Sequence, residues 1–245
     1  MKRFAAVTFD LWDTLIQEYP GGAQKVAKLR VESIAEILAA KGLAHSEEEI
    51  RAAYEKTGDF LALAWSKTRD MPVRDHILFM ATCIDDKLAN KLGNSDLADI
   101  ERSYVESILE HPPRLLSGAR KALADVRGNG YKLGLISNTG RTPGSVLRTI
   151  MRNMGILEFF EVTTFSNEIL VRKPAEGAFR NTLDEMRVTP KVAVHVGDDV
   201  DKDVTGAKRA GMKAVQVSLK GQKRSPIADG YVTSLEQVAD RIEGL

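Results

Sequence analysis

The sequence contains a single cysteine, Cys83, among 245 residues. This excludes an internal disulfide framework and a cysteine-based zinc site, and it fits a reducing compartment. No apolar run approaches the roughly 18 residues that a membrane-spanning helix requires. Neither sign of charge is in excess, because 35 Lys and Arg residues face 34 Asp and Glu residues. We therefore expect neither nucleic acid nor a membrane as a partner.

The N-terminus also lacks the marks of an export signal. Met1 to Phe4 lead into an apolar stretch that is too short for a signal-peptide core, and no small-residue cleavage site follows. The apolar fraction of 43% and the charged fraction of 28% are those of an ordinary globular protein. We expect a cytoplasmic protein, either a monomer or a homodimer, with one large domain or one domain that carries an inserted second.

Short apolar runs alternate with helical patterns at the start of the chain and in its second half. The expected strands span residues 4–9, 131–136, 162–164, 192–196, 214–217 and 231–232. The expected helices between them span residues 118–127, 143–154, 176–186, 203–210 and 235–242. Alternation of this kind predicts an α/β fold with a doubly wound, Rossmann-like parallel sheet.

The segment after the first strand has helical periodicity and almost no strand pattern. Ser46 and Glu49 have the spacing of a capping box at a helix start. The expected helices span residues 23–40, 46–65, 73–92 and 97–109. We therefore predict a catalytic core from residues 1–17 and 111–245, and an inserted helical domain at residues 18–110.

Polar residues follow three of the expected strands. Asp10 ends the first, Ser137 and Asn138 follow the second, and Asp198 follows the strand over 192–196. In an open parallel sheet, ligands bind outside the carboxyl ends of the strands. Lys173, in a loop, is expected at the same edge. Facing carboxylates repel one another, and hard oxygen ligands of this kind suit Mg²⁺.

At this point the sequence resembles the haloacid dehalogenase (HAD) superfamily. The resemblance lies in four segments in the family's order, which together cover the predicted core: Phe9 to Leu15, Ile136 to Thr139, Arg172 to Pro174 and Val196 to Asp203. The helical insertion stands where members of the family carry a helical (C1-type) cap. Each segment alone is a weak signal, but four in order at strand ends are strong.

The resemblance implies roles for residues of the first three segments. Asp10 matches the nucleophile that forms an aspartyl phosphate. The backbone carbonyl of Trp12 matches a magnesium ligand, and Trp12 itself is a candidate substrate contact. Ser137 and Asn138 match the groups that bind the transferring phosphoryl group, and Lys173 matches the cation that balances its charge and that of Asp10.

The resemblance also implies a metal site. Asp10 and Asp198 match the carboxylates that bind Mg²⁺, and Asp203 matches a second acid that reaches the metal through water or holds Lys173. Thr14 matches a residue of the loop just after the nucleophile, where it is a candidate for phosphate binding. The implied chemistry is mainly positioning and charge stabilisation.

One position departs from the family's pattern. Phosphatases of the family carry an aspartate two residues after the nucleophile, which serves as general acid and base. Trp12 stands there instead, and Asp13, one place later, is expected to point elsewhere. Dehalogenases of the family also carry an aromatic residue at this position and need no metal, but they lack the acidic fourth segment.

These observations leave three functions open. We favour a Mg²⁺-dependent phosphatase of a small phosphorylated metabolite, because the acidic segment from Asp198 to Asp203 is intact. The alternatives are a metal-independent dehalogenase-like hydrolase and a catalytically weak protein that binds phosphate in a regulatory role.

Three further residues carry simpler expectations. Arg172 is expected at the surface or facing the cap, outside the catalytic machinery. His195 is expected to pack within its strand, and Cys83 to be buried as a small hydrophobic residue.

Overall fold

A six-stranded sheet forms the centre of the protein in a computed structural model that describes residues 3–219 and 221–245. Its strand order is β5-β4-β1-β6-β7-β8, and all neighbouring strands are parallel. The strands are β1 (Ala6–Phe9), β4 (Lys132–Ser137), β5 (Val162–Phe165), β6 (Ala193–Gly197), β7 (Lys213–Val217) and β8 (Gly230–Val232). The predicted doubly wound α/β class is confirmed.

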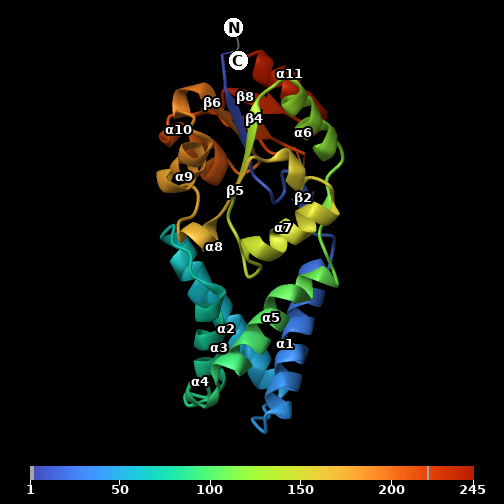
Figure 1. Cartoon of the computed structure of the whole chain (residues 1–245), viewed down its shortest axis with the longest axis vertical. Helices are drawn as coiled ribbons and strands as arrows, with labels where there is room; N and C mark the ends of the chain where they lie inside the picture. Colours follow the sequence, from blue (N-terminus) through green and yellow to red (C-terminus); the bar gives the residue numbers. More distant parts are fainter. Residues whose placement is uncertain (1–2, 220) are drawn as a thin grey trace.

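Helices cover both faces of this sheet (Figure 1). One face carries α6 (Ala119–Gly128), α7 (Gly144–Asn153) and α11 (Val238–Glu243), and the other carries α9 (Glu176–Met186) and α10 (Gly206–Arg209). A short helix, α8 (Ser166–Ile169), follows β5. Strands β1 and β6, at the centre of the sheet, are fully buried because helices cover both of its faces.

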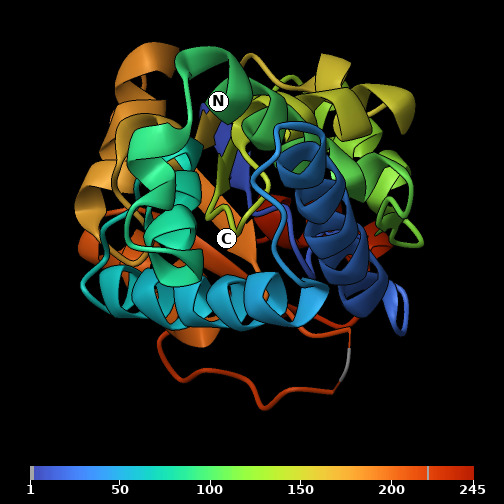
Figure 2. The ribbon, with the colours of Figure 1, turned by 90° about the horizontal axis from the view of Figure 1, so that it is seen from below.

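The inserted segment forms a helical block with an apolar core of its own, over residues 22–109. Its helices are α1 (Gly22–Ala40), α2 (Glu47–Ser66), α3 (Val73–Ile84), α4 (Leu88–Lys91) and α5 (Asn94–Glu106). Ser46 and Glu49 form the predicted capping box, since each accepts a hydrogen bond from the other's backbone N–H. Figures 1 and 2 show the block beyond one end of the sheet, opposite the chain termini.

A small antiparallel pair, which the sequence pattern did not reveal, stands where the chain enters and leaves the block. Its strands, β2 (Ile16–Gln17) and β3 (Arg114–Leu115), have two residues each. A second connection joins the block to the core, because Arg69 and Val171 form an antiparallel bridge. The block is therefore tied to the core at two separate places.

Two helix predictions are wrong in their boundaries. The helix expected over 73–92 breaks after Ile84, where the Asp85 side chain accepts a hydrogen bond from the Lys87 N–H (3.0 Å) and competes with the helical pattern. The helix expected over 203–210 begins earlier, as a π-helical turn over Val200–Thr205. Asp199 starts that turn by accepting from two backbone N–H groups.

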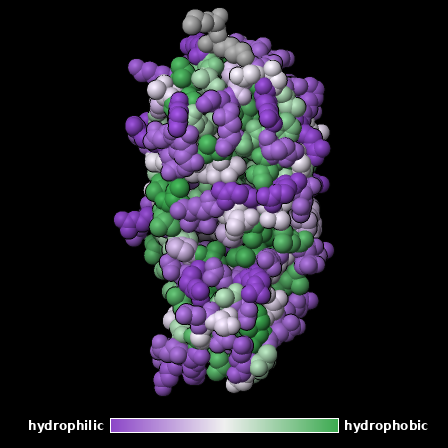
Figure 3. Space-filling view, viewed as in Figure 1, coloured by the Kyte–Doolittle hydropathy of each residue, from purple (hydrophilic) through white to green (hydrophobic). Residues whose placement is uncertain are grey.

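The surface is mixed in polarity. Hydrophilic side chains cover much of the face in Figure 3, and apolar areas lie between them. Among residues 3–219 and 221–245, no helix is long and apolar enough to cross a membrane.

Candidate active site

Lys173 is the centre of the polar cluster at the carboxyl edge of the sheet. Its ammonium group donates to Asp10 Oδ1 and to Asp203 Oδ1, each at 2.6 Å. Lys173 is 3% exposed. Phe9 lies opposite Leu135 and Val196 in the sheet, so the residues that follow these strands reach the same edge. The predicted convergence of Asp10 and Lys173 on this edge is therefore present in the structure.

The close approach of Asp203 to the end of β6 requires a glycine. A Cβ atom on Gly197 would lie 2.4 Å from Asp203 Cγ, well inside van der Waals contact. The π-helical turn then brings the Asp199 backbone N–H to Asp203 Oδ2 at 3.0 Å. Any larger residue at position 197 would displace the carboxylate that holds Lys173.

His195 supports Asp203 from within β6. Its Nε2 lies 3.2 Å from Asp203 Oδ1, and its Nδ1 lies 2.8 Å from the Thr8 hydroxyl. Burial lowers the pKa of His195 despite the neighbouring carboxylate. A neutral ring donates from Nε2 to Asp203 and accepts at Nδ1 from Thr8. The histidine is packed in its strand as expected, but it also orients a site carboxylate.

Asn138 holds the loop that carries Lys173. Its side-chain oxygen accepts from the Lys173 backbone N–H (2.8 Å), and its amide group donates to the Lys173 carbonyl (3.0 Å). This pair of bonds fixes the loop after α8 to the loop after β4. Asn138 therefore positions Lys173, in addition to lining the cavity beside it.

The electrostatics of the cluster favour a cation. Burial, together with the charges of Asp203 and Asp198, raises the pKa of Asp10 to about 7, although Lys173 opposes the shift. Burial and the neighbouring carboxylates of Asp203 and Asp13 raise the pKa of Asp198 to about 6. Three carboxylates share this space with one ammonium group, so negative charge is incompletely balanced.

The pKa values of Lys173 and Asp203 shift so that both groups stay charged. Burial alone would lower the pKa of Lys173, but the charges of Asp10 and Asp203 outweigh it and raise that pKa. Burial alone would raise the pKa of Asp203, yet Lys173 and His195 hold it below its usual range. Lys173 is thus charged, and Asp203 is ionised.

One oxygen from each of Asp10, Asp198 and Asp203 can be chosen so that all lie within 4.8 Å of one another. This grouping and its unbalanced charge fit a divalent cation. Both oxygens of Asp203 already accept hydrogen bonds, from Lys173 and His195 on one side and from a backbone N–H on the other.

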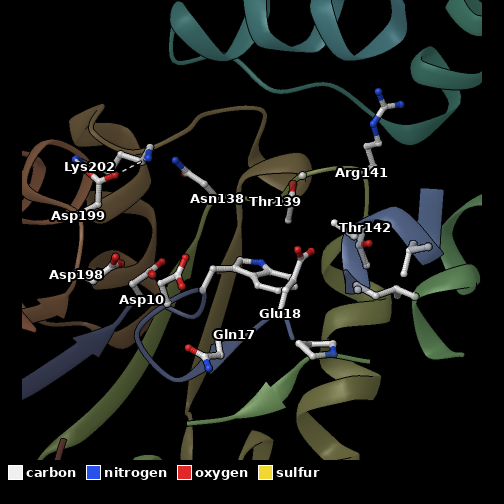
Figure 4. A pocket seen from close by; sticks show the side chains of 18 of the residues that line it. Asp10, Gln17, Glu18, Asn138, Thr139, Arg141, Thr142, Asp198, Asp199 and Lys202 are labelled. Carbon is white, nitrogen blue, oxygen red and sulfur yellow. Dashed lines mark hydrogen bonds and ion pairs between the residues drawn. The ribbon is translucent and has the colours of Figure 1, made fainter. Parts of the chain in front are cut away.

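A cavity of about 700 Å³ opens from this cluster toward the helical block. The cluster residues Asp10, Asp198 and Lys173 line one part of it, and residues of α1 and α2 line another. Figure 4 shows Asp10 and Asp198 on one side of the cavity, with Arg141 and Thr142 on the other. The site therefore lies between the sheet edge and the block.

Two of the predicted phosphate-binding residues do not line this cavity. Ser137 is 1% exposed, and its hydroxyl donates to the Asn138 carbonyl at 3.4 Å. Thr14 is fully buried and donates to Asp198 Oδ1 at 3.4 Å. Thr14 thus contacts Asp198 of the carboxylate cluster, and Ser137 directly precedes Asn138, which lines the cavity.

Trp12 has two environments at once. It lines the cavity next to Asp10, and it packs against the apolar core of the sheet domain. Asp13, which follows, has a left-handed backbone (φ 58°) and also lines the cavity. Asp13 therefore places a carboxylate in the cavity, although it stands one residue after the position of the family's acid. Simple alternation along a strand predicts that it points elsewhere.

Arg172 is buried rather than at the surface, which corrects part of the sequence expectation. Its guanidinium donates to Asp70 Oδ2 at 2.7 Å and lies over the Trp65 ring, 4.4 Å from the centroid. Both partners belong to the helical block, so Arg172 does face the predicted cap. Cys83 is half-buried instead of fully buried.

Sequence reasoning missed Asp70, Arg30 and Arg141, all of which lie where the block meets the core. Asp70 accepts from Arg172, and the two arginines line the cavity. A charged residue within an otherwise apolar helical face, such as Arg30 between Val26 and Ile34, was the one available signal.

Comparison with known proteins defines the class. The family model of haloacid dehalogenase-like hydrolases matches residues 4–211. The chain belongs to this family, as its four segments predict, and it is a hydrolase.

Relatives and solved structures agree with this assignment. A glyceraldehyde 3-phosphate phosphatase of Pyrococcus furiosus is 26% identical over 99% of this chain and 95% of its own. One of Methanopyrus kandleri is 36% identical, but the match spans 46% of this chain and about half (48%) of that relative. A phosphoserine phosphatase of Thermus thermophilus is 28% identical over 85% of this chain and 86% of its own. The structure of a HAD phosphatase from Thermococcus onnurineus shares the fold, with a TM-score of 0.63, 23% identity and 96% coverage of both chains.

Proposed function

We propose that the protein is a Mg²⁺-dependent phosphatase of a small phosphorylated metabolite. The observation that carries this proposal is Lys173, buried between Asp10 and Asp203 with Asp198 alongside, at one end of a cavity. A buried cation among carboxylates is suited to phosphoryl oxygens, because it balances charge that develops during transfer. The phosphatase names of the relatives support the same reaction class.

Asp10 is the proposed nucleophile. Lys173 holds its Oδ1 and orients the carboxylate toward the cavity. The carboxylate attacks phosphorus, the bond from phosphorus to the ester oxygen breaks, and the alcohol leaves with a proton from solvent. Water then attacks the aspartyl phosphate, which releases inorganic phosphate and restores Asp10. Asn138 holds the Lys173 loop beside the phosphoryl group, and Ser137, the residue before it, is the proposed hydroxyl partner of that group.

Asp10, Asp198 and the backbone carbonyl of Trp12 would hold Mg²⁺ directly, and Asp203 would do so through water because its own oxygens are already engaged. When bound, the ion would neutralise phosphoryl charge and the mutual repulsion that raises the pKa values of Asp10 and Asp198.

The helical block, over residues 18–110, acts in this proposal as a cap on a core of residues 1–17 and 111–245. It closes the cavity, excludes water from the reacting groups and selects the substrate. The protein acts in the cytoplasm, as expected from its composition.

Trp12 is the reason to consider alternative functions. An indole cannot protonate a leaving group, so a metal-independent dehalogenase-like reaction on Asp10 is the alternative, as is a weakly active phosphate-binding protein. The carboxylate cluster favours the phosphatase, because a reaction without a metal gains nothing from three facing acids.

Hydrolysis of a panel of phosphorylated metabolites and of phenyl phosphate tests the proposal, with Mg²⁺ and with a chelator. Mg²⁺-dependent phosphate release that Asp10→Asn abolishes would support it. Halide release from 2-haloacids in the presence of chelator would favour the dehalogenase instead. Asp125→Asn, an exposed change in an ion pair with Lys121, is the matched control.

A further inference from the structure

Two arginines stand at the far end of the cavity from Asp10. Arg30, on α1, donates from Nε to the Tyr104 carbonyl (2.7 Å) and from one NH₂ group to the Thr142 hydroxyl (3.0 Å). Arg141, in the loop after β4, donates to the Tyr104 hydroxyl (2.8 Å) and to the Tyr54 carbonyl (2.7 Å). Both guanidinium groups therefore gather around the same two tyrosines.

Within the part of the chain that the structure describes, neither arginine has an acidic partner. All the hydrogen bonds of the two groups go to hydroxyl or carbonyl oxygens, and among residues 3–219 and 221–245 neither takes part in an ion pair. Arg30 is only 5% exposed. A buried charge is costly unless it is paired, and two like charges side by side add to that cost. A negatively charged group beside the two arginines would balance this charge.

The donors of these groups are not exhausted. A guanidinium has five N–H donors, whereas Arg30 uses three of them and Arg141 uses two. The Arg141 guanidinium lies over the Tyr54 ring, 3.8 Å from its centroid. It also lies against Gly58 of α2, where a Cβ atom would come within 2.8 Å of it. Its position is thus fixed, with donors to spare.

The cavity connects these arginines with the proposed phosphoryl site. Arg30, Arg141 and Thr142 line the same cavity as Asp10 and Lys173. Figure 4 shows Glu18 between the two ends. Glu18 is exposed and repels anions near the middle of the cavity, so a second anion is favoured only at the arginine end.

We propose that Arg30 and Arg141 bind a second anionic group of the substrate, a carboxylate, at the end of the cavity opposite the phosphoryl group. The substrate class is then a phosphorylated carboxylic acid. This rests on the proposed function for the phosphoryl end alone. Guanidinium groups bind carboxylates in a fork-like geometry, and such charge-assisted bonds are stronger than neutral ones.

The two arginines also tie the helical block to the core, since Arg30 reaches Thr142 and Arg141 reaches Tyr54. If the arginines only tie the block to the core, replacing one of them changes the affinity for every ligand of the cavity equally. If they bind a carboxylate, the replacement changes the affinity for acidic ligands alone. The experiment therefore compares matched ligands with and without the acid.

The first measurement is calorimetric binding of ω-phosphonocarboxylic acids of increasing chain length to the full chain in Mg²⁺, each beside its primary amide. Phosphonates are not hydrolysed, so binding is measured without turnover. We expect one chain length to bind at least about tenfold more tightly as the acid than as the amide. Equal affinity for acid and amide at every length, or no binding of any acid, overturns the proposal.

Variants then locate the acid-binding groups. Arg141→Gln, at a half-buried position, is expected to reduce the affinity for the acid about tenfold and to bring it to that of the amide. Arg141→Lys keeps the charge and loses the fork, so it is expected to fall between the two. Arg180→Gln, an exposed change on α9, is the control and leaves both affinities unchanged. A proportionate loss for acid and amide in Arg141→Gln identifies a tie alone and refutes the proposal.

Kinetic measurements distinguish a failure of the proposed carboxylate site from a failure of the proposed phosphatase reaction. Turnover of phenyl phosphate without any preference for 4-carboxyphenyl phosphate or for the ω-phosphorylated acids supports the reaction and refutes the carboxylate site. If the phosphonates bind selectively as acids but no ester is hydrolysed, the phosphatase proposal is refuted and the carboxylate site is supported.

Discussion

Replacement of Asp70 by asparagine is expected to destabilise the junction of block and core. The Asp70 side chain is fully buried, and it forms an ion pair with Arg172 at 2.7 Å. Its two oxygens accept from five groups: Arg172 NH1, the Thr139 and Ser166 hydroxyls, the Trp65 indole N–H and the Met71 backbone N–H. Asparagine keeps the shape but carries one acceptor oxygen and no charge.

The size of the loss in stability depends on the contacts that Arg172 keeps in the variant. Removing one partner of a buried ion pair costs about 3–5 kcal/mol, mainly because the other charge stays buried and unpaired. Arg172 would still donate to the Thr139 carbonyl and lie over the Trp65 ring. We therefore expect a loss near the lower limit, about 3 kcal/mol in the free energy of unfolding.

Denaturant unfolding of Asp70→Asn, Arg172→Met and the double variant measures this loss and the coupling between the two residues. The double variant is expected to lose less than the sum of the single losses, because it leaves no unpaired charge. Asp125→Asn, in an exposed ion pair, is the control and should change stability by less than about 1 kcal/mol. A loss below about 1 kcal/mol in Asp70→Asn, or strict additivity in the cycle, would refute the reasoning.

Two more outcomes are expected. Trp12→Asp is expected to speed alkyl phosphate hydrolysis by about 10²-fold or more, and phenyl phosphate hydrolysis much less, because the good leaving group hardly needs an acid; a folded variant that is slower on both esters would contradict this. Burial, together with Arg141 and Arg30 and against the opposing charge of Asp70, lowers the pKa of His76 to about 4. The folded protein therefore excludes a proton that the unfolded chain binds, and stability falls as pH drops from 6.5 to about 4. Unfolding of His76→Leu across this range should show a decline smaller by up to about 3 kcal/mol than that of the unaltered protein; parallel declines would exclude His76 as the cause.

The strands, most of the helices and the convergence on the sheet edge could be predicted because their signals are local. A buried parallel strand is a short apolar run, and the residue after it is placed by the chain itself. Asp10 and Asp198 therefore reach one edge as soon as the strands before them pair in parallel. The capping box of Ser46 and Glu49 is equally local, since three residues separate its partners.

Some helix boundaries could not be predicted from hydrophobic periodicity, because side-chain hydrogen bonds also set them. Asp85 ends α3 by accepting from Lys87, a competition between side chain and backbone that hydrophobic periodicity does not register. The hydrogen bond from Thr14 to Asp198 was likewise not predicted, because it depends on the loop conformation after β1.

The sequence by itself determined the family, the core fold and the side chains of the carboxylate cluster, because strand patterns and motif order are encoded along the chain. Only the tertiary structure decided what faces that cluster across the cavity. Arg30 meets Thr142 across more than a hundred residues, and Asp70 meets Arg172 over a similar separation. Such contacts depend on how two separately packed bodies dock, and no local pattern of residues records that geometry.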